Sequence, residues 1–316
     1  MAGFDPSLQP TESRAHLLTE QSNDRSSRLD QLDTAELVQL FVEEDRRPQQ
    51  AVSAAADALA RAVDGIVERL ESGGRLFYLG AGTSGRLGVL DAAECPPTFC
   101  SDPELVQGVL AGGAPALLRS SEGLEDLEEA GRSDLLSRGF GAADCLVGIA
   151  AGGTTPYVRG GLACAKELGA LAIAMACVPS QQAPLPCDID IRLLTGPELL
   201  TGSTRLKAGT ATKMALNILS TGVMVRLGKV YGNRMVDVSA SNSKLVDRSL
   251  RILADLAGVD RSEGTRLLNA ADGSVKTALL MAAASLSADQ ARELLERHQQ
   301  QLRPALQACG ASLAQP

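Results

Sequence analysis

Residues 76–88 read LFYLGAGTSGRLG, and this stretch decides the fold class of the chain. Four apolar residues predict a buried strand, and a loop of glycine, threonine and serine follows before a helical pattern begins. Glycines let the backbone turn sharply and expose N–H groups, while the following helix directs the positive end of its dipole at the same point. Two hydroxyls add further donors. The residues of this loop predicted to bind a phosphate are Gly82, Thr83, Ser84 and Gly85.

The same letters satisfy the G-x-G-x-x-G fingerprint of dinucleotide-binding folds, which is an alternative interpretation. Such folds place an acid at the end of a second strand, about 20 residues further on. Residues 94–103 read ECPPTFCSDP instead, and three prolines argue against a central strand there. The next predicted strand, 106–110, is followed by Ala-Gly-Gly without an acid. A phosphate site is therefore favoured over a dinucleotide site or a purely structural turn.

The bulk composition is that of a globular protein and excludes several function classes. The chain has 316 residues, of which 45% are hydrophobic and 22% charged, close to ordinary usage. Aromatic residues make up only 3% and tryptophan is absent, so stacking platforms for nucleic acid are not expected. A net charge of -8 argues against nucleic-acid and anionic-membrane partners. Any phosphate must therefore be bound locally by amides and hydroxyls.

Cysteine and histidine usage predicts a reducing compartment and no metal. Seven cysteines, an odd number, stand in mostly apolar settings and are interpreted as buried free thiols. Only two histidines occur, and there is no Cys-x-x-Cys pair, so no metal site is expected. The first residues lack the pattern of a secretion signal, and no apolar run is long enough to span a membrane. We therefore expect a cytoplasmic protein without a membrane partner.

The hydrophobic pattern divides the chain into three predicted regions. Residues 1–47 are interpreted as a polar, aperiodic arm followed by a first helix, which is predicted to start at residues 33–36 (DTAE). Residues 48–242 open with one long helix, with Pro48 in its first turn, and then alternate short apolar strands with helices. Residues 243–316 contain no strand pattern and predict a small domain of three or four helices.

The alternation of strands and helices in the middle region predicts an α/β fold. Strands buried on both faces form a parallel sheet with helices on both faces. The predicted strands cover residues 76–79, 106–110, 145–150, 170–176 and 189–194.

Ligands of parallel sheets bind beyond the carboxyl ends of the strands. Three loops in such positions, residues 80–85, 151–155 and 201–204, are rich in glycine and hydroxyl residues. The candidate ligand contacts in the second and third of these loops are Gly153, Thr154, Thr155, Ser203 and Thr204.

Carboxylates are the candidate proton carriers, since His16 lies in the arm and His298 in a charged helix. Glu94 is predicted to close the helix that begins on the first loop, with two prolines directing the chain beyond it, and residues 89–93 predict apolar surroundings for it. Glu125 follows the second strand and its Gly-Gly turn. Each of these glutamates could also be an ordinary surface acid, Glu125 as a first-turn acid that favours its helix dipole.

Residues 80–98, GAGTSGRLGVLDAAECPPT, resemble the signature of the bacterial N-acetylmuramic acid 6-phosphate etherases, and the likeness extends over about residues 18–305. The chain departs from that pattern at Gly152, where the family commonly has serine. Further similar stretches are 19–23 (TEQSN), 122–126 (EGLED), 155–158 (TPYV), 202–210 (GSTRLKAGT) and 233–238 (NRMVDV).

This resemblance implies a sugar isomerase (SIS) domain and a cofactor-independent lyase that acts on a sugar phosphate. It assigns Glu94 as the acid that protonates the departing lactate and Glu125 as the second acid/base residue. It also implies a homodimer with sites near the interface. Lys207 is a further candidate partner for the phosphate charge, with a helix-surface role as the alternative.

Two other functions remain open, because SIS domains also occur outside the etherases. One is a non-catalytic sugar-phosphate sensor, and the other is an aldose-ketose phosphosugar isomerase. The presence of both glutamates favours the etherase over the sensor, and the Glu-Cys-Pro-Pro-Thr element favours it over the isomerase by resemblance.

Overall fold

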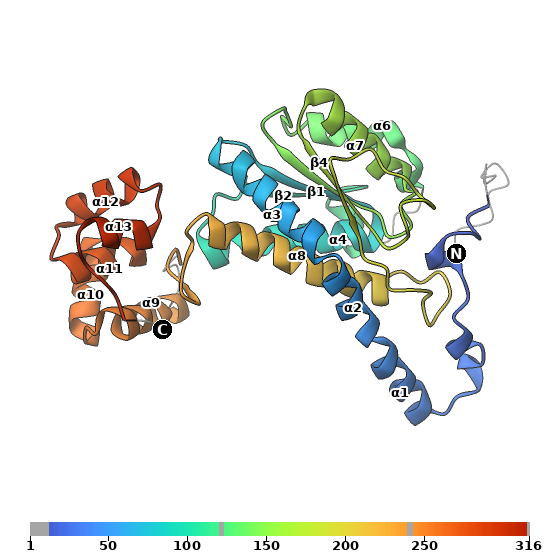
Figure 1. Cartoon of the computed structure of the whole chain (residues 1–316), viewed down its shortest axis with the longest axis horizontal. Helices are drawn as coiled ribbons and strands as arrows, with labels where there is room; N and C mark the ends of the chain where they lie inside the picture. The colour runs from blue at the N-terminus through green and yellow to red at the C-terminus, as the bar shows by residue number, and fades with distance from the viewer. Residues whose placement is uncertain (1–12, 120–122, 239–242, 315–316) are drawn as a thin grey trace.

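The computed structural model describes residues 13–119, 123–238 and 243–314 (Figure 1). Its centre is a five-stranded parallel sheet with strand order β2-β1-β3-β4-β5. The strands match the five predicted segments to within two residues at each end, and all their carboxyl ends meet at one edge of the sheet. They are β1 (Leu76–Gly80), β2 (Val106–Leu110), β3 (Cys145–Ile149), β4 (Leu171–Ala176) and β5 (Ile189–Arg192).

Helices cover both faces of this sheet, as the apolar strands require. Leu76 and Tyr78 of β1 pack into one hydrophobic core with four helices, while Phe77 and Leu79 point into a second core on the other face. The first face carries α2 (Arg46–Ala54), α3 (Ala56–Glu71), α4 (Gly82–Phe99) and α8 (Lys207–Arg226). The second face carries α6 (Glu128–Leu136) and α7 (Pro156–Leu168), and the short α5 (Pro115–Leu118) follows β2.

The N-terminal segment is more ordered than the predicted arm. Three 3₁₀ turns, η1 (Leu18–Glu20), η2 (Asp24–Ser26) and η3 (Leu29–Gln31), precede α1 (Thr34–Glu44). The predicted start of α1 is confirmed by a capping box between Asp33 and Glu36. Residues 1–12 lie outside the described part of the chain.

The single long helix predicted after Pro48 is wrong. The structure has two helices that meet at Ala55, and Pro48 is the third residue of the first one. Ala55 has φ -92° and ψ 6°, outside the helical region, so the regular helix is interrupted there. Figure 1 shows α1 and α2 extending away from the sheet.

The C-terminal region is an all-helical unit with a hydrophobic core of its own. Its described part contains five helices rather than the three or four predicted, and a short hairpin of β6 (Val230–Tyr231) and β7 (Arg234–Met235) precedes it (Figure 1). A separate core is what an independent domain requires, and domain boundaries at residues 47 and 242 stay predictions. The helices are α9 (Ser243–Ala257), α10 (Arg261–Ala270), α11 (Val275–Ala284), α12 (Ala288–Arg297) and α13 (Leu302–Ala308).

Candidate functional site

The first loop connects β1 to α4 in a single tight turn at the carboxyl edge of the sheet. A Cβ at residue 85 would lie 2.3 Å from the carbonyl oxygen of Gly80, so only glycine fits there. Gly82 has φ +52°, a left-handed conformation that glycine adopts without strain. The N–H groups of the first turn of α4 have no partner within the helix, and the half-buried Thr83 and Ser84 stand beside them. This arrangement can bind an anion.

The second loop runs from β3, which pairs with β1, into α7. Gly153 has φ +69°, and a Cβ there would lie 2.8 Å from the side chain of Ala183. Thr155 precedes α7, but its hydroxyl makes no capping hydrogen bond and is free for a ligand. Gly152 lies between two hydroxyls, because a Cβ there would make ordinary van der Waals contact with Thr19 Oγ1 at 3.7 Å and Thr154 Oγ1 at 3.8 Å.

The third loop lies beside the first loop in space. A Cβ at Gly209, near the start of α8, would lie 3.5 Å from both the side chain of Thr83 and the carbonyl oxygen of Thr204. Ser203 and Thr204 are half-buried. The structure therefore brings the first and third loops together, although their residues are far apart in the chain.

Lys207 has a different role from the predicted one. Its ammonium is buried and donates a 2.5 Å hydrogen bond to Glu44 Oε2, so its charge is already balanced and faces no ligand. Burial alone would raise the pKa of Glu44, but hydrogen bonds from Lys207 and Arg25 outweigh it and hold this pKa below its ordinary value. The buried Glu198 accepts the backbone N–H groups of residues 207 and 208, and burial raises its pKa.

The surroundings of Glu94 also differ from the prediction. Helix α4 does not close at this residue but continues through Pro96 and Pro97 to Phe99. Glu94 and Ala93 are exposed, so the predicted apolar surroundings are absent in the single chain. Glu94 is twelve positions after Gly82, which places the glutamate about 18 Å along the helix from the first loop.

Glu125 lies in a separate exposed turn, η4 (Leu124–Asp126), which packs against α7. The turn follows Gly123, whose φ of +93° reverses the chain. Since α7 covers one face of the sheet and α4 the other, Glu94 and Glu125 of one chain stand on opposite sides of it. Glu122, from the same motif, lies outside the described residues.

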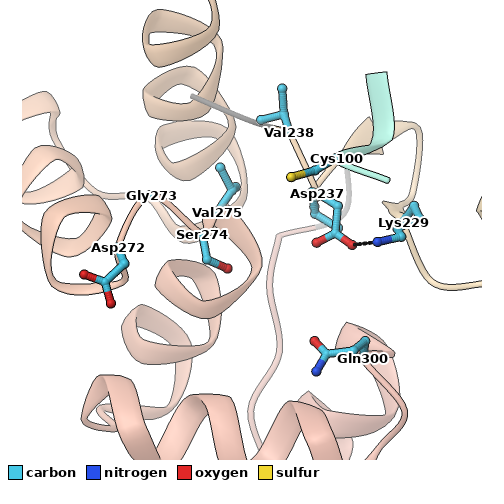
Figure 2. Close-up of a pocket in the computed structure, with 10 residues that line it drawn as sticks. Cys100, Lys229, Asp237, Val238, Asp272, Gly273, Ser274, Val275 and Gln300 are labelled. Atoms are coloured by element: carbon cyan, nitrogen blue, oxygen red, sulfur yellow. Dashed lines mark ion pairs between the residues drawn. The ribbon is translucent and has the colours of Figure 1, made fainter. Parts of the chain in front are cut away.

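A pocket of about 540 Å³ lies at the junction between the α/β part and the C-terminal helices (Figure 2). Asp237 stands in it and pairs with Lys229 at 2.9 Å and with the buried Lys276 at 2.8 Å. None of the predicted site residues lines this pocket. The motif at 233–238 therefore contributes Asp237 to the contact between the α/β part and the C-terminal helices. The sequence alone did not predict this role.

The described residues contain no group of three or more His, Cys, Asp or Glu placed to hold a metal ion. All seven cysteines are free, but Cys100 and Cys309 are exposed rather than buried as predicted. Burial raises the pKa of Cys177 to about 12, so this thiol is not a nucleophile. Among the described helices, none has the length and apolar character needed to cross a bilayer.

Residues 58–166 match the glucokinase regulatory protein N-terminal SIS domain, so the parallel sheet with glycine- and hydroxyl-rich loops at its carboxyl edge is a sugar isomerase (SIS) domain. The chain is 81% identical to the N-acetylmuramic acid 6-phosphate etherase of Synechococcus sp. (strain CC9902), with all of both chains covered. It belongs to the N-acetylmuramic acid 6-phosphate etherase family.

More distant proteins also resemble the chain. The etherase of Crocosphaera subtropica is 60% identical over 95% of this chain and 99% of its own. Among solved structures, a phosphoheptose isomerase from Neisseria gonorrhoeae is 17% identical, with 59% of this chain and 97% of that chain covered and a TM-score of 0.44.

Proposed function

We propose that this protein is a cofactor-independent carbon–oxygen lyase that converts N-acetylmuramic acid 6-phosphate to N-acetylglucosamine 6-phosphate and D-lactate, in the recycling of peptidoglycan. The observation that carries this proposal is the 81% identity to an etherase over the full length of both chains. The three loops at the sheet edge support it, because they offer amides and hydroxyls for a sugar phosphate.

The first loop is the proposed phosphate site, with Thr83 and Ser84 donating hydroxyls beside the amides of α4. Thr154 and Thr155 supply donors from the second loop, next to the backbone of Gly153. Ser203 and Thr204 come from the third loop, which lies beside Thr83. Lys207 takes no part, because Glu44 already holds its ammonium.

The reaction needs two proton carriers. In the open-chain sugar the aldehyde acidifies the proton on C2, and one carboxylate removes it. The bond between C3 and the lactate oxygen breaks as the C2–C3 double bond forms, and a carboxylic acid protonates the departing oxygen. Water then adds its oxygen to C3 and a proton returns to C2. We assign protonation of lactate to Glu94 and the second acid/base role to Glu125.

A homodimer reconciles this assignment with the position of Glu94. C3 of a hexose lies only a few covalent bonds from its 6-phosphate, whereas Glu94 lies about 18 Å along α4 from the loop of its own chain. The face of α4 around Glu94 carries Leu90, 46% exposed, and the adjoining α8 carries Ile218, 43% exposed. A second copy that covers this apolar face would receive Glu94 in its own site.

We place the protein in the cytoplasm. Its seven cysteines are all free, including the exposed Cys100 and Cys309, and free thiols persist in a reducing compartment.

The reaction is tested with purified protein and N-acetylmuramic acid 6-phosphate in heavy-oxygen water, followed by mass spectrometry. We expect D-lactate without label and N-acetylglucosamine 6-phosphate with label at C3. Label in lactate would contradict the elimination. In a parallel assay with an aldose phosphate that has a hydroxyl on C2, conversion to the ketose phosphate would identify an isomerase. Binding of the muramic acid phosphate without turnover would identify a sensor.

The roles of the two glutamates are tested by Glu94→Gln and Glu125→Gln. Each is expected to lower turnover at least about a hundredfold, the usual scale for general acid/base groups. Asp126→Asn, in the same turn as Glu125, is the matched control and should retain turnover. Turnover close to normal in either glutamate variant removes that residue from the mechanism.

The shared site is tested by mixing the two inactive variants. In a mixed dimer, one site combines an intact Glu125 with an intact Glu94 of the other subunit. Random assembly of a two-fold dimer should therefore restore about a quarter of normal turnover. A mixture that exchanges subunits but stays inactive would show that both glutamates act within one chain.

A further inference from the structure

The segment Leu17–Asn23, here called the strap, is held against the α/β domain at both ends. Leu17 is buried against Val178 and Ala183, and the next N–H group donates a 2.9 Å hydrogen bond to Gln182 Oε1. At the other end, the side-chain amide of Asn23 donates to the carbonyl oxygen of residue 197 at 3.1 Å and to Glu44 Oε2 at 3.0 Å. The strap therefore has a defined position over the loops it crosses.

Two consecutive residues of the strap face two different loops of the candidate site. Thr19 is completely buried, and its hydroxyl lies 3.7 Å from the position that a Cβ would take at Gly152 in the second loop. Oε2 of Glu20 lies 3.3 Å from the position that a Cβ would take at Gly202 in the third loop. The strap thus bridges the second and third loops and adds a carboxylate beside the third.

The chemistry of Glu20 indicates what it can bind. Its side chain is exposed, and within the described part of the chain its carboxylate accepts no hydrogen bond and forms no ion pair. The buried carboxylates nearby, Glu44 and Glu198, are by contrast fully engaged. An ionised carboxylate only accepts hydrogen bonds, so it suits hydroxyl or amide N–H donors and repels phosphate.

We infer that Glu20 is a substrate-contacting residue, which accepts a hydrogen bond from a hydroxyl or the acetamido N–H group of the sugar. The inference rests on the proposed function, since it places the phosphate at the first loop and the sugar toward the third. The strap thereby forms a wall of the site, and Thr19 positions Glu20 by packing against the second loop.

Glu20→Gln tests this contact, and Asp24→Asn, another exposed carboxylate one turn further along, is the matched control. Loss of a charged hydrogen bond is expected to lower kcat/KM about tenfold to a hundredfold, mainly through KM. Binding of N-acetylglucosamine 6-phosphate, measured by calorimetry, should weaken by a similar factor, while binding of inorganic phosphate should not change. The control variant should behave like the unmodified protein.

The outcomes separate this inference from the proposed function. If the unmodified protein releases D-lactate and Glu20→Gln matches it in kcat/KM and in sugar-phosphate affinity, the Glu20 contact is wrong and the function stands. Equal weakening of sugar phosphate and inorganic phosphate would also overturn it, because the effect would then be structural. If the unmodified protein releases no D-lactate but binds the sugar phosphate through Glu20, the function fails and the contact stands.

Discussion

At the scale of single residues, the buried charge of Lys207 is balanced by a residue that is distant in the sequence but adjacent in space. Lys207 follows a hydroxyl-rich loop, a position that suggested a phosphate ligand. Its partner, Glu44, stands 163 positions earlier and ends α1. The ammonium of Lys207 therefore forms a buried ion pair and is not available to a ligand. The carboxylate of Glu20 has no such partner among the described residues, so it can contact a ligand.

Glu44→Gln is expected to lower the free energy of unfolding by about 3 kcal/mol at neutral pH, because it leaves the buried Lys207 without a counter-charge. The pKa of Glu44 is lowered in the folded state, so its stabilisation is complete above the ordinary glutamate pKa of about 4.3 and is lost as the pH falls below it. Urea unfolding of both proteins at a series of pH values measures this difference. A difference independent of pH would contradict the assignment.

Glu43 provides the matched control. It also pairs with Arg25, but on the surface, and Glu43→Gln should change the free energy of unfolding by less than about 1 kcal/mol.

At the scale of elements, α4 links the phosphate loop to an outward face. Asp91 points inward, where Ser220 Oγ of α8 lies 3.3 Å from its carboxylate, and burial raises the pKa of Asp91. Leu90, the residue before Asp91, and Glu94, about one turn after it, are exposed. One helix therefore carries both the proposed phosphate-binding amides, at its start, and the exposed Leu90 and Glu94, near its end, which we propose face a second copy.

Leu90→Asp is expected to weaken the proposed dimer, because it sets a charge into the apolar contact. Sedimentation velocity should show a shift toward monomer, with a parallel loss of turnover. Leu118→Asp, on a side chain 91% exposed in α5, should leave the sedimentation unchanged. An unmodified protein that is monomeric at assay concentrations would rule the shared site out.

At the scale of the whole molecule, the described residues form three substantial hydrophobic cores. Two lie on the faces of the sheet and the third lies within the C-terminal helices. Asp237 links the helical unit to the α/β part, since it pairs with Lys229 just after α8 (Figure 2) and with Lys276 inside the helical unit. Burial lowers the pKa of Lys276, while the nearby Asp237 carboxylate opposes this shift.

Asp237→Ala is expected to lower the free energy of unfolding by about 3 kcal/mol, because a buried lysine loses its partner. Unfolding in urea, followed by circular dichroism, measures the change. Asp255→Ala removes the exposed pair with Arg234 and should cost less than about 1 kcal/mol. Equal effects of the two substitutions would show that the junction contributes no more than a surface ion pair.

Local order along the chain was enough to predict the sheet, its loops and the start of α1. A buried strand is a run of apolar residues and a tight turn needs glycine, so the pattern of β1 and residues 80–85 carries both signals within a few positions. The break at Ala55, the packing of Leu17–Asn23 and the pairing of Lys207 with Glu44 depend on residues far apart in sequence. Only the tertiary structure decided these, because burial and charge pairing are set by neighbours in space. The same reason explains Glu94: its sequence neighbours predicted apolar surroundings, but the packing of α4 on α8 leaves it facing outward.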